Sequence, residues 1–375
     1  MMARPLAIAW KELIQLRRDR LTLAMAGALP IMQIILFGYA INTDVRHIPL
    51  VVFDQDHSAA SRDLVATLEA TRFYDLVGHV RSSAQIETAL RAGHARTALV
   101  VPPRFSSDLR RGLPTSVQLI VDGSDPQTVG SAINTATGVV AARAAALSVE
   151  RLARVGQPPA PPPLSLEPTT WYNPELKTAI FVVPGLVGVI LTMTMIMLTA
   201  MGIARERERG TLEQLVVSPI GRVELMIGKI VPYVGIGYVQ MTLILLVGSF
   251  LFHTPIVGSL PLLYLLALLF IAANLALGLF FSTLARTQQQ AMQMSFFFLL
   301  PNILLSGFMF PFEAMPRPAQ WLAQALPLTH FLRIVRGIAL KGATLGDLWG
   351  ELLALAAIFV ILVSVAAARF RKKVG

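Results

Sequence analysis

The chain of 375 residues contains no cysteine. Without a thiol it can form no disulfide framework, no thiolate metal site and no cysteine nucleophile, and cysteine usage gives no indication of the redox compartment. Charge is scarce as well: 14% of the residues are Asp, Glu, Lys or Arg, whereas 54% are apolar and the mean hydropathy is +0.62. This composition excludes an ordinary soluble domain and indicates a membrane protein.

Patterns of catalytic and metal-binding residues are also lacking. The six histidines are scattered and show no zinc-type spacing. Residues 221–230 come nearest to a phosphate-binding loop, but six residues separate the two glycines, and Ile230 stands where Ser or Thr would hold magnesium. We therefore expect no catalytic residues, no metal site and no cofactor in this chain.

The formal net charge of +10 is distributed unevenly. Residues 44–178 hold 13 Lys or Arg and 13 Asp or Glu, so the whole excess of positive charge lies in and beside the apolar segments. Positive charge next to membrane segments sets their orientation. The charge is therefore a topology signal, and it gives no support to nucleic-acid binding.

Six apolar runs are long enough to cross a hydrocarbon core of roughly 30 Å, which takes about 20 helical residues. They are residues 21–41, 179–203, 230–252, 260–281, 294–310 and 348–368. No Asp, Glu, Lys, Arg or His lies in the core of a run. This counts against an ion-coupled carrier, which normally needs an ionisable group at mid-membrane, although backbone carbonyls could still bind sodium.

Lys and Arg gather in the amino-terminal tail, after the second run and in the carboxyl-terminal tail. With six spans these segments lie on one side, which the positive charge identifies as the cytoplasm. We therefore predict a multi-pass protein of the bacterial cytoplasmic (inner) membrane with both termini in the cytoplasm. A signal peptide is the rival interpretation of the first run, but its length and the lack of an A-x-A site favour a retained span.

The connection between the fifth and sixth runs does not fit this charge pattern. It would carry Arg317, Arg333, Arg336 and Lys341 on the outside. Its length and its apolar residues suggest short helices lying in the outer interface, where long basic side chains can reach water.

Residues 42–178 form a polar insert large enough to have its own core. Three stretches have the pattern of short apolar strands that end at turn signals, and three others have the pattern of helices, with Ser58 and Ser82 or Ser83 as N-caps. The expected strands are residues 49–56, 97–102 and 117–125, the expected helices are residues 58–70, 83–92 and 127–155, and residues 156–163 read as a stiff Pro-rich linker. This alternation predicts a small α/β domain with a partly parallel sheet.

Four aspartates stand at the ends of these strands: Asp54, Asp56, Asp122 and Asp125. They could suggest a metal site. Aspartates at strand ends are more often turn or cap residues, and we favour that interpretation.

The predicted fold is an α-helical polytopic membrane protein with six transmembrane helices and an extracytoplasmic α/β domain inserted between the first and second spans. An amphipathic helix over residues 1–20 precedes the first span at 21–41. The segments that follow are the outer domain at 42–178, spans two to six within 179–368, a cytoplasmic loop at 204–229, an outer re-entrant or interfacial hairpin at 311–347 and a basic tail at 369–375.

The cytoplasmic loop begins with the sequence ARERERGTLEQLVVSPI, residues 204–220. Thr211 can cap a new helix, and Gln214 stands three residues later to complete a capping box. The apolar residues that follow give this helix one apolar face. The stretch could be a plain topology anchor, or a short helix that inserts into a cleft on another protein.

The same stretch, followed by GRVELMIGK, strongly resembles the cytoplasmic loop of ABC-2 type exporter permeases. The matching positions are Arg205, Glu206, Arg207, Glu208, Gly210, Thr211, Glu213, Leu215, Pro219, Gly228 and Lys229. The amino-terminal helix with the first run, and the hairpin containing Pro327, Leu328 and Thr329, are similar to the corresponding parts of that family. His330 departs from the family, in which an aromatic residue is common at this position. The large insert is similar to the subgroup of drug- and lipid-type exporters.

The resemblance implies a dimer of this chain with a second permease copy or a paralogue, docked to two separate ATP-binding cassette subunits that carry ATP and magnesium. Glu206, Glu208 and Glu213 would meet basic groups on the ATPase, while Gly210 and Thr211 shape the turn. The interleaved glutamates have no role in topology, so docking becomes the better interpretation of the loop.

Other roles are less specific. The amino-terminal helix, with Trp10, Lys11, Glu12 and Arg17, has the pattern of an interfacial helix, which would serve either as an anchor or in gating. The candidates for path lining are Thr192, Met195, Thr199 and Asn302, although such residues more often simply pack.

We therefore predict the permease subunit of an ATP-driven exporter for an amphipathic or hydrophobic substrate. Membrane lipids are expected partners, and the outer domain suggests docking to a periplasmic adaptor and an outer-membrane channel. The alternative is a non-transporting membrane scaffold whose outer domain binds an envelope partner.

Overall fold

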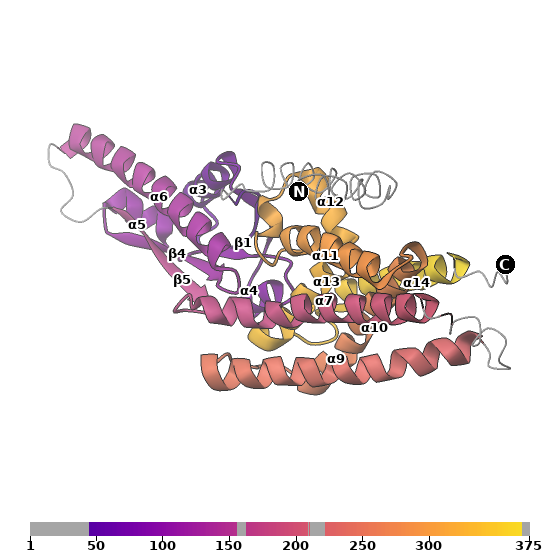
Figure 1. Cartoon of the computed structure of the whole chain (residues 1–375). Coiled ribbons are helices and arrows are strands. Elements are labelled where there is room, and N and C mark those ends of the chain that lie inside the picture. The colour runs from indigo at the N-terminus through magenta and orange to yellow at the C-terminus, as the bar shows by residue number, and fades with distance from the viewer. Residues whose placement is uncertain (1–44, 156–162, 209, 211–221, 370–375) are drawn as a thin grey trace, which may run out of the picture.

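The computed structural model describes residues 45–155, 163–208, 210 and 222–369. Two parts are visible in Figure 1, a sheet domain on the left and long helices that run away from it to the right. The amino-terminal helix and the first predicted span lie outside the described residues.

The sheet domain contains five strands: β1 (Ile48–Asp54), β2 (Tyr74–His79), β3 (Thr97–Val101), β4 (Thr115–Asp122) and β5 (Leu164–Trp171). Their order in the sheet is β2-β1-β3-β4-β5. Every neighbouring pair is parallel except β3 and β4, which are antiparallel. The predicted partly parallel α/β fold is therefore confirmed. Strands β2 and β5 were not predicted.

Four helices belong to this domain: α3 (Ala59–Ala70), α4 (Ser83–Arg91), α5 (Phe105–Arg111) and α6 (Pro126–Val155). The N-caps of α3 and α4 are Ser58 and Ser82, whose side chains accept hydrogen bonds from backbone N–H groups in the first turn. Helix α6 packs against β5 and β4, and the Tyr74 hydroxyl donates to the Ala132 carbonyl on α6. The core is built from inward-facing aliphatic side chains of the strands and of α3 and α6.

The strand-end aspartates act in turns and ion pairs. Asp54 accepts hydrogen bonds from the backbone of Asp56 and His57 and from the Ser61 hydroxyl. Asp56 accepts one from the backbone of Ser106. In the part of the chain that the structure describes, no three His, Asp or Glu side chains are placed to hold a metal ion.

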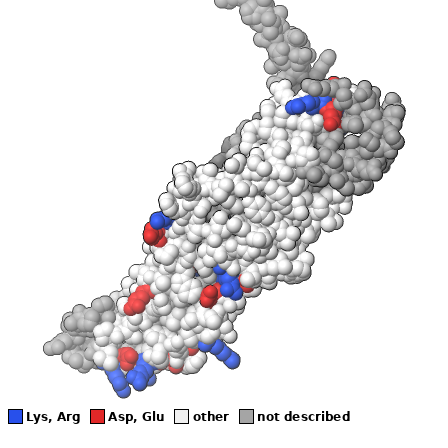
Figure 2. Space-filling model, turned by 90° about the horizontal axis from the view of Figure 1, so that it is seen from below, with Lys and Arg blue, Asp and Glu red and all other residues white. Residues whose placement is uncertain are grey.

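The long helices are α7 (Thr178–Glu208), α9 (Arg222–Phe252), α10 (Leu260–Leu284), α11 (Gln288–Leu305) and α14 (Trp349–Arg369). Among the described residues, five helical segments are long and apolar enough to cross a membrane. They are Pro126–Val149 on α6, Ala179–Glu208, Pro232–Phe252, Leu260–Leu284 and Trp349–Ala366. Figure 2 shows a broad uncharged band on one face of the molecule, with charged side chains to either side of it. The chain is thus a helical membrane protein that also contains an α/β sheet region.

Helix α11 differs from the predicted fifth span, residues 294–310. It begins at Gln288 and ends at Leu305, where Gly307 takes a left-handed conformation with φ +85°. Polar residues Gln288, Gln289 and Gln290 fill its first turn, so it is not among the five apolar segments. The apolar residues after 305 belong instead to a turn and a short 3-10 helix, η1 (Phe312–Ala314).

Helix α10 lies at the centre of the helical part and packs against α7, α14, α13 (Pro327–Lys341) and α9. A Cβ atom on Gly278 of α10 would lie 2.7 Å from the Ile196 carbonyl oxygen on α7, so the glycine permits this close approach. Phe270 of α10 and Phe331 of α13 stack with their ring centroids 4.0 Å apart.

The region between α11 and α14 is only partly as predicted. Trp321 and Leu322 on α12 (Arg317–Gln324) are exposed, as expected for an interfacial helix. Helix α13 is almost wholly buried, however, and Lys341 is only 9% exposed. Its cations do not extend into water as expected: Lys341 contacts the sheet domain, Arg333 pairs with Glu351 of α14, and Arg336 donates to the Gly307 carbonyl.

Candidate functional site

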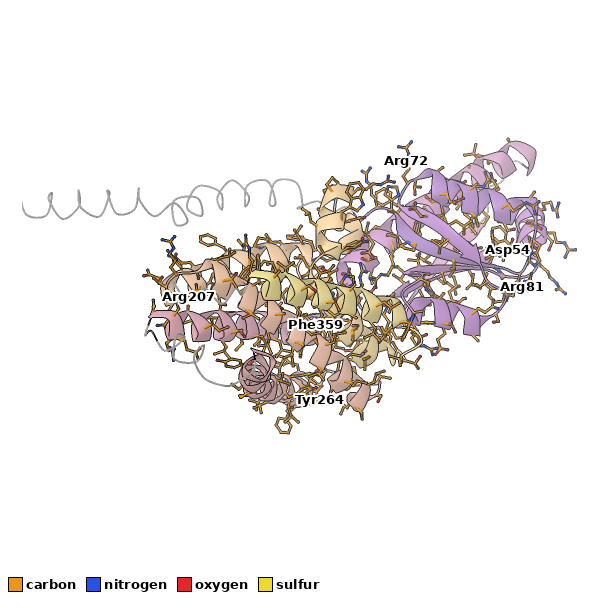
Figure 3. All side chains as sticks on the ribbon, turned by 90° about the vertical axis from the view of Figure 1, so that its right-hand side faces the viewer. Asp54, Arg72, Arg81, Arg207, Tyr264 and Phe359 are labelled. Atoms are coloured by element: carbon orange, nitrogen blue, oxygen red, sulfur yellow. The ribbon has the colours of Figure 1, made fainter. Side chains whose placement is uncertain are left out.

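The last turn of α7 carries the described part of the predicted docking loop, at the end of the helices farthest from the sheet domain (Figure 3). The Arg207 guanidinium donates hydrogen bonds to the carbonyl oxygens of Ser282 and Ala285, at 3.1 and 2.7 Å. These carbonyls lie at the carboxyl end of α10, where the helix leaves acceptors without intrahelical donors. A cation there also interacts favourably with the helix dipole.

Glu208 is a hydrogen-bond acceptor at the start of α11, where a helix leaves N–H donors without partners. One carboxylate oxygen accepts a hydrogen bond from the Gln288 backbone N–H at 2.9 Å, and the other accepts from the Gln288 side-chain amide at 2.6 Å. Arg205 donates to the same Gln288 side chain at 3.1 Å. The alternating charges of α7 therefore fasten its end to the turn between α10 and α11.

The remaining predicted loop residues are only partly described. Glu206 lies half-buried on α7, and Gly210 takes a left-handed conformation with φ +69° just after the helix. The other loop residues and the amino-terminal site residues lie outside the described residues: Thr211, Glu213, Leu215, Pro219, Trp10, Lys11, Glu12 and Arg17. Their docking and anchoring roles stay predictions.

The predicted path residues are all buried inside the chain. Thr192 and Met195 are fully buried on α7, Thr199 on the same helix donates to the Met195 carbonyl, and Asn302 is buried on α11. The Thr192 hydroxyl and the Asn302 amide have no hydrogen-bond partner among the described residues. Helices α7 and α11 pack against each other. The structure thus places all four residues on two neighbouring helices, and their role as a path lining stays a prediction.

A cluster of charged residues that the sequence did not reveal joins the sheet domain to the membrane helices. Asp122, at the end of β4, is fully buried and pairs with Lys341 of α13 at 2.5 Å and with Arg96 at 3.0 Å. Arg96 also pairs with Glu313 of η1 at 3.2 Å. On the other side, Arg91 of α4 pairs with Asp347 at 3.1 Å. Each of these ion pairs, except that of Arg96 with Asp122, bridges the two parts of the molecule.

The electrostatics of this cluster follow from its burial. Burial alone would raise the pKa of Asp122, but the charges of Lys341 and Arg96 lower it to about 2. Burial lowers the pKa of Lys341, and Asp122 opposes this effect. Burial and the neighbouring Glu313 raise the pKa of Asp125. The cations and the carboxylates in this cluster therefore favour one another's charged forms, but burial outweighs this effect at Lys341 and at Asp125.

His330 stands at a position where the family commonly has an aromatic residue, and it belongs to a second group of contacts. Its Nδ1 lies 2.6 Å from a carboxylate oxygen of Glu351 on α14, and its Nε2 lies 2.8 Å from the Gln324 carbonyl. Arg333 donates to the other oxygen of Glu351 at 2.9 Å and stacks on the Phe312 ring. An aromatic hydrocarbon at position 330 could not make these hydrogen bonds.

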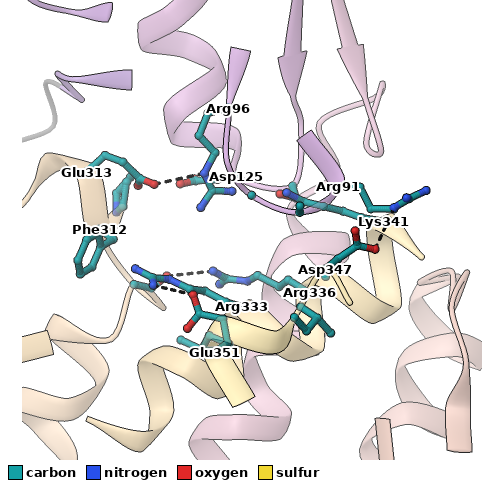
Figure 4. A pocket seen from close by; sticks show the side chains of 18 of the residues that line it. Arg91, Arg96, Asp125, Phe312, Glu313, Arg333, Arg336, Lys341, Asp347 and Glu351 are labelled. Atoms are coloured by element: carbon teal, nitrogen blue, oxygen red, sulfur yellow. Dashed lines mark hydrogen bonds and ion pairs between the residues drawn. The ribbon is translucent and has the colours of Figure 1, made fainter. Parts of the chain in front are cut away.

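These groups surround a cavity of about 310 Å³ between the sheet domain and α13 (Figure 4). Five of its lining residues are cationic and four are anionic: Arg91, Arg96, Arg333, Arg336 and Lys341, with Asp125, Glu313, Asp347 and Glu351. No sequence motif indicates this site, because its members come from strand ends, loops and three helices. The sequence gives two partial signals: the strand-end aspartates Asp122 and Asp125, and the group of cations between residues 317 and 341 that does not fit the charge pattern.

The fold and the site define a multi-pass helical membrane protein. Ion pairs join its α/β domain to the helices, and a charged loop stem (residues 205–208 at the end of α7) lies at the opposite end. Residues 20–368 match the family described as ABC-2 family transporter protein, and the chain belongs to this family. It is similar to the probable multidrug ABC transporter permease YbhR of Escherichia coli strain K12, with 33% identity over 364 residues, which cover 97% of each chain.

Two further relatives come from the same bacterium. The probable multidrug ABC transporter permease YbhS is 31% identical over 339 residues, which cover 90% of this chain and 88% of the relative. The inner membrane transport permease YhhJ is 30% identical over 331 residues, which cover 87% and 86%. The chain is therefore a transmembrane transport permease of the ABC class.

Proposed function

We propose that the chain is the membrane subunit of an ATP-driven exporter, which pairs with a second permease copy or a paralogue and moves an amphipathic or hydrophobic substrate outward. The observation that supports this proposal is the fastening of the α7 end to two other helices. Through Arg207 and Glu208, a force on the loop after α7 acts on α10 and α11 together.

Helix α7 extends this connection along the whole membrane part. It is continuous over 31 residues, which corresponds to about 46 Å at 1.5 Å per residue. At its other end, Phe181 lies under the guanidinium of Arg336 on α13, beside the charged cluster. Helix α7 therefore runs from the loop stem at one end to the charged cluster beside the sheet domain at the other.

In this proposal the loop over residues 204–229 faces the cytoplasm and docks in a cleft of a separate ATP-binding cassette subunit, which carries ATP and magnesium. Both termini are cytoplasmic, the first of six spans precedes the described residues, and the sheet domain is extracytoplasmic. Such a domain could dock to a periplasmic adaptor and an outer-membrane channel. The names of YbhR and YbhS, which mention multidrug transport, support an amphipathic drug-like substrate.

Co-purification with a candidate ATP-binding subunit tests the docking. We expect Glu213→Arg in the loop to abolish retention of that subunit, because it reverses a charge proposed to meet basic groups. Glu167→Arg on the exposed edge of β5 is the matched control and should retain it. Equal retention by both variants, or no retention by the wild type, would count against the proposal.

The scaffold alternative cannot be tested cleanly by removing the sheet domain. Such a deletion would remove Asp122 and leave Lys341 buried without its carboxylate, which destabilises the remaining helices for reasons unrelated to function. The rate of ATP hydrolysis by the ATP-binding subunit, measured with and without this chain, separates the two functions better. A permease should change this rate, whereas a scaffold should leave it the same.

A further inference from the structure

Four polar side chains on the long helices each have a buried oxygen atom without a hydrogen-bond partner among the described residues. They come from four different helices: Thr192 on α7, Gln240 on α9, Asn274 on α10 and Asn302 on α11. At Asn302 the amide nitrogen is unpaired as well. A buried polar atom that forms no hydrogen bond is costly, and a membrane interior offers no water to replace the missing partner. These four side chains therefore need an explanation.

Neighbouring hydroxyl groups on the same helices are paired. Thr199 on α7, Thr242 on α9 and Ser295 on α11 each donate to the backbone carbonyl four residues earlier in their own helix. Ser and Thr in a helix have this carbonyl within reach, yet the Thr192 hydroxyl does not use it. The unpaired atoms are thus confined to particular positions and are not a general property of the polar residues in these helices.

Thr192 and Asn274 lie at the same level of the helices. Helices α7 and α10 run in the same direction, because the last turn of α7 contacts the end of α10 through Arg207. A Cβ atom on Gly278 of α10 would lie 2.7 Å from the Ile196 carbonyl oxygen on α7. Asn274 and Thr192 each stand four residues before one of these two contact residues, which is about one helical turn.

The unpaired residue of α9 lies at this level too. Two glycines of α9 pack against α7, Gly237 against Met195 and Gly248 against Val183. Helix α9 therefore runs opposite to α7. Gln240 stands three residues after the first of these glycines, and Thr192 stands three residues before the methionine that this glycine contacts. The two side chains are thus level with each other.

Helix α11 completes the level. It contacts α7 through Gln288 with Glu208 and through Phe308 with Gly185, so it also runs opposite to α7. Because helices rise evenly, Asn302 and residue 192 fall at about the same fraction of the distance between these two contacts. We call the four side chains with unpaired atoms the polar layer. Its members on α7, α9 and α10 lie close to the midpoints of the apolar segments Ala179–Glu208, Pro232–Phe252 and Leu260–Leu284.

The polar layer is closed in this structure. Thr192 and Asn274 are fully buried, Asn302 is almost fully buried, and the unpaired oxygen of Gln240 is inaccessible as well. Nothing reaches the unpaired atoms unless the helices move. Polar groups that lack partners when the helices are closed make the closed state less stable than purely apolar packing would, and they lower the free energy needed to reach a state in which they are solvated.

We propose that the helices separate at the polar layer in a second state of the permease, in which its four side chains are hydrated. Hydration then supplies the missing hydrogen bonds and offsets part of the cost of separating the apolar surfaces around them. This inference deepens the proposed function and rests on it, because a path through the membrane requires such an opening. The polar layer is also where the polar groups of an amphipathic substrate would find hydrogen-bond partners.

The test uses single cysteines in the full-length protein in lipid nanodiscs, because the chain has no cysteine of its own. A charged methanethiosulfonate reacts only where water reaches the thiol. Ala132→Cys, fully buried in the core of the sheet domain, reports reaction through unfolding, and Ala84→Cys, exposed on α4, reports free reaction. We expect Thr192→Cys to react at least about tenfold faster than Ala132→Cys and far more slowly than Ala84→Cys, because the opening is local.

Asn302→Cys, on another helix of the polar layer, should react as Thr192→Cys does. Rates for both cysteines that are no faster than that of Ala132→Cys would overturn the proposal.

A second arm tests whether the Thr192 hydroxyl is unpaired in the closed state. Thr192→Val keeps the shape of the side chain and removes the hydroxyl, so it should raise the midpoint of thermal unfolding. Thr199→Val on the same helix removes a paired hydroxyl and should not raise it. A midpoint for Thr192→Val no higher than that for Thr199→Val would show that the hydroxyl already has a partner, and the proposal would then be wrong.

The ATP-binding subunit separates this inference from the proposed function. If the subunit and ATP change the rate of reaction of Thr192→Cys, both are supported. A rate that exceeds that of Ala132→Cys but does not respond to ATP supports the opening of the polar layer and counts against the coupling.

Discussion

Asp122 and Lys341 show how a single buried pair holds two parts of this molecule together. Both side chains are nearly inaccessible to water, and Lys341 also donates to the Leu90 carbonyl. Removing one partner of a buried pair leaves an uncompensated charge. The pair therefore connects the end of β4 to α13, and each of its two charges depends on the other.

Asp122→Asn should lower the free energy of unfolding by roughly 3–5 kcal/mol, because Lys341 stays buried without a carboxylate. The double variant Asp122→Asn with Lys341→Met should recover a large part of this loss, since no unpaired charge remains. Thermal unfolding of the wild type, of Asp122→Asn, of Lys341→Met and of the double variant in detergent forms a double-mutant cycle. Additive losses in the double variant would show that the two side chains do not interact.

Stability should also fall in acid. The pKa of Asp122 is about 2 in the folded protein and about 3.9 in an unfolded chain, so its stabilisation is fully present above the unfolded value and is lost as pH falls from about 5 to 2. The lowered pKa values of Glu313 and Asp347 act in the same direction, whereas the raised pKa of Asp125 opposes them.

The pH effect can be assigned to one residue. Unfolding midpoints measured between pH 6 and 3 should fall less steeply for the double variant of Asp122 and Lys341 than for the wild type. The same slope in both proteins would assign the acid sensitivity to other carboxylates.

Among the elements, those with a clear period and a clear cap could be predicted from the sequence. Helices α3 and α4 begin at the predicted serines, and β1, β3 and β4 are dense apolar runs that fill the core. Strand β2 alternates buried and exposed residues over only six positions, and β5 contains Pro168. A proline argues against a strand, yet an edge strand tolerates it, and β5 lies at the edge of the sheet.

The surroundings of α13 could not be predicted, because they depend on contacts between distant segments. Lys341 meets Asp122 across 219 positions of the sequence, and Arg96 meets Glu313 across 217. A local pattern of apolar and basic residues is the same for a helix lying in an interface and for one covered by another domain. The loop stem could be recognised in the sequence, because its charged residues are contiguous. Their contacts with Gln288 could be seen only in the structure.

The packing of α7 on α10 leads to a prediction at the level of the element. Gly278→Ala should destabilise the protein by about 1–3 kcal/mol, because the new methyl would meet backbone atoms of Ile196 that cannot move independently. Gly130→Ala on α6 is the control, since its Cβ would meet open space and alanine favours a helix. Equal thermal midpoints for both variants would contradict the close approach.

For the whole molecule, the composition was sufficient to identify a membrane protein, and a charged loop was sufficient to indicate the family that the relatives confirm. The structure adds a continuous series of contacts from the loop stem to the sheet domain. Arg207 and Glu208 join α7 to α10 and α11 at one end, Phe181 and Arg336 join it to α13 at the other, and ion pairs join α13 to the sheet domain.

The most direct test of a permease driven by a partner ATPase is the rate of ATP hydrolysis by its co-purified ATP-binding subunit. We predict that the wild-type chain changes this rate, and that Arg207→Ala, which breaks the contact with α10 and keeps the three glutamates proposed to meet the ATPase, retains the subunit but loses the change. Arg286→Ala, an exposed arginine between α10 and α11, should behave as the wild type. A rate that is the same with and without the permease would contradict the proposed coupling.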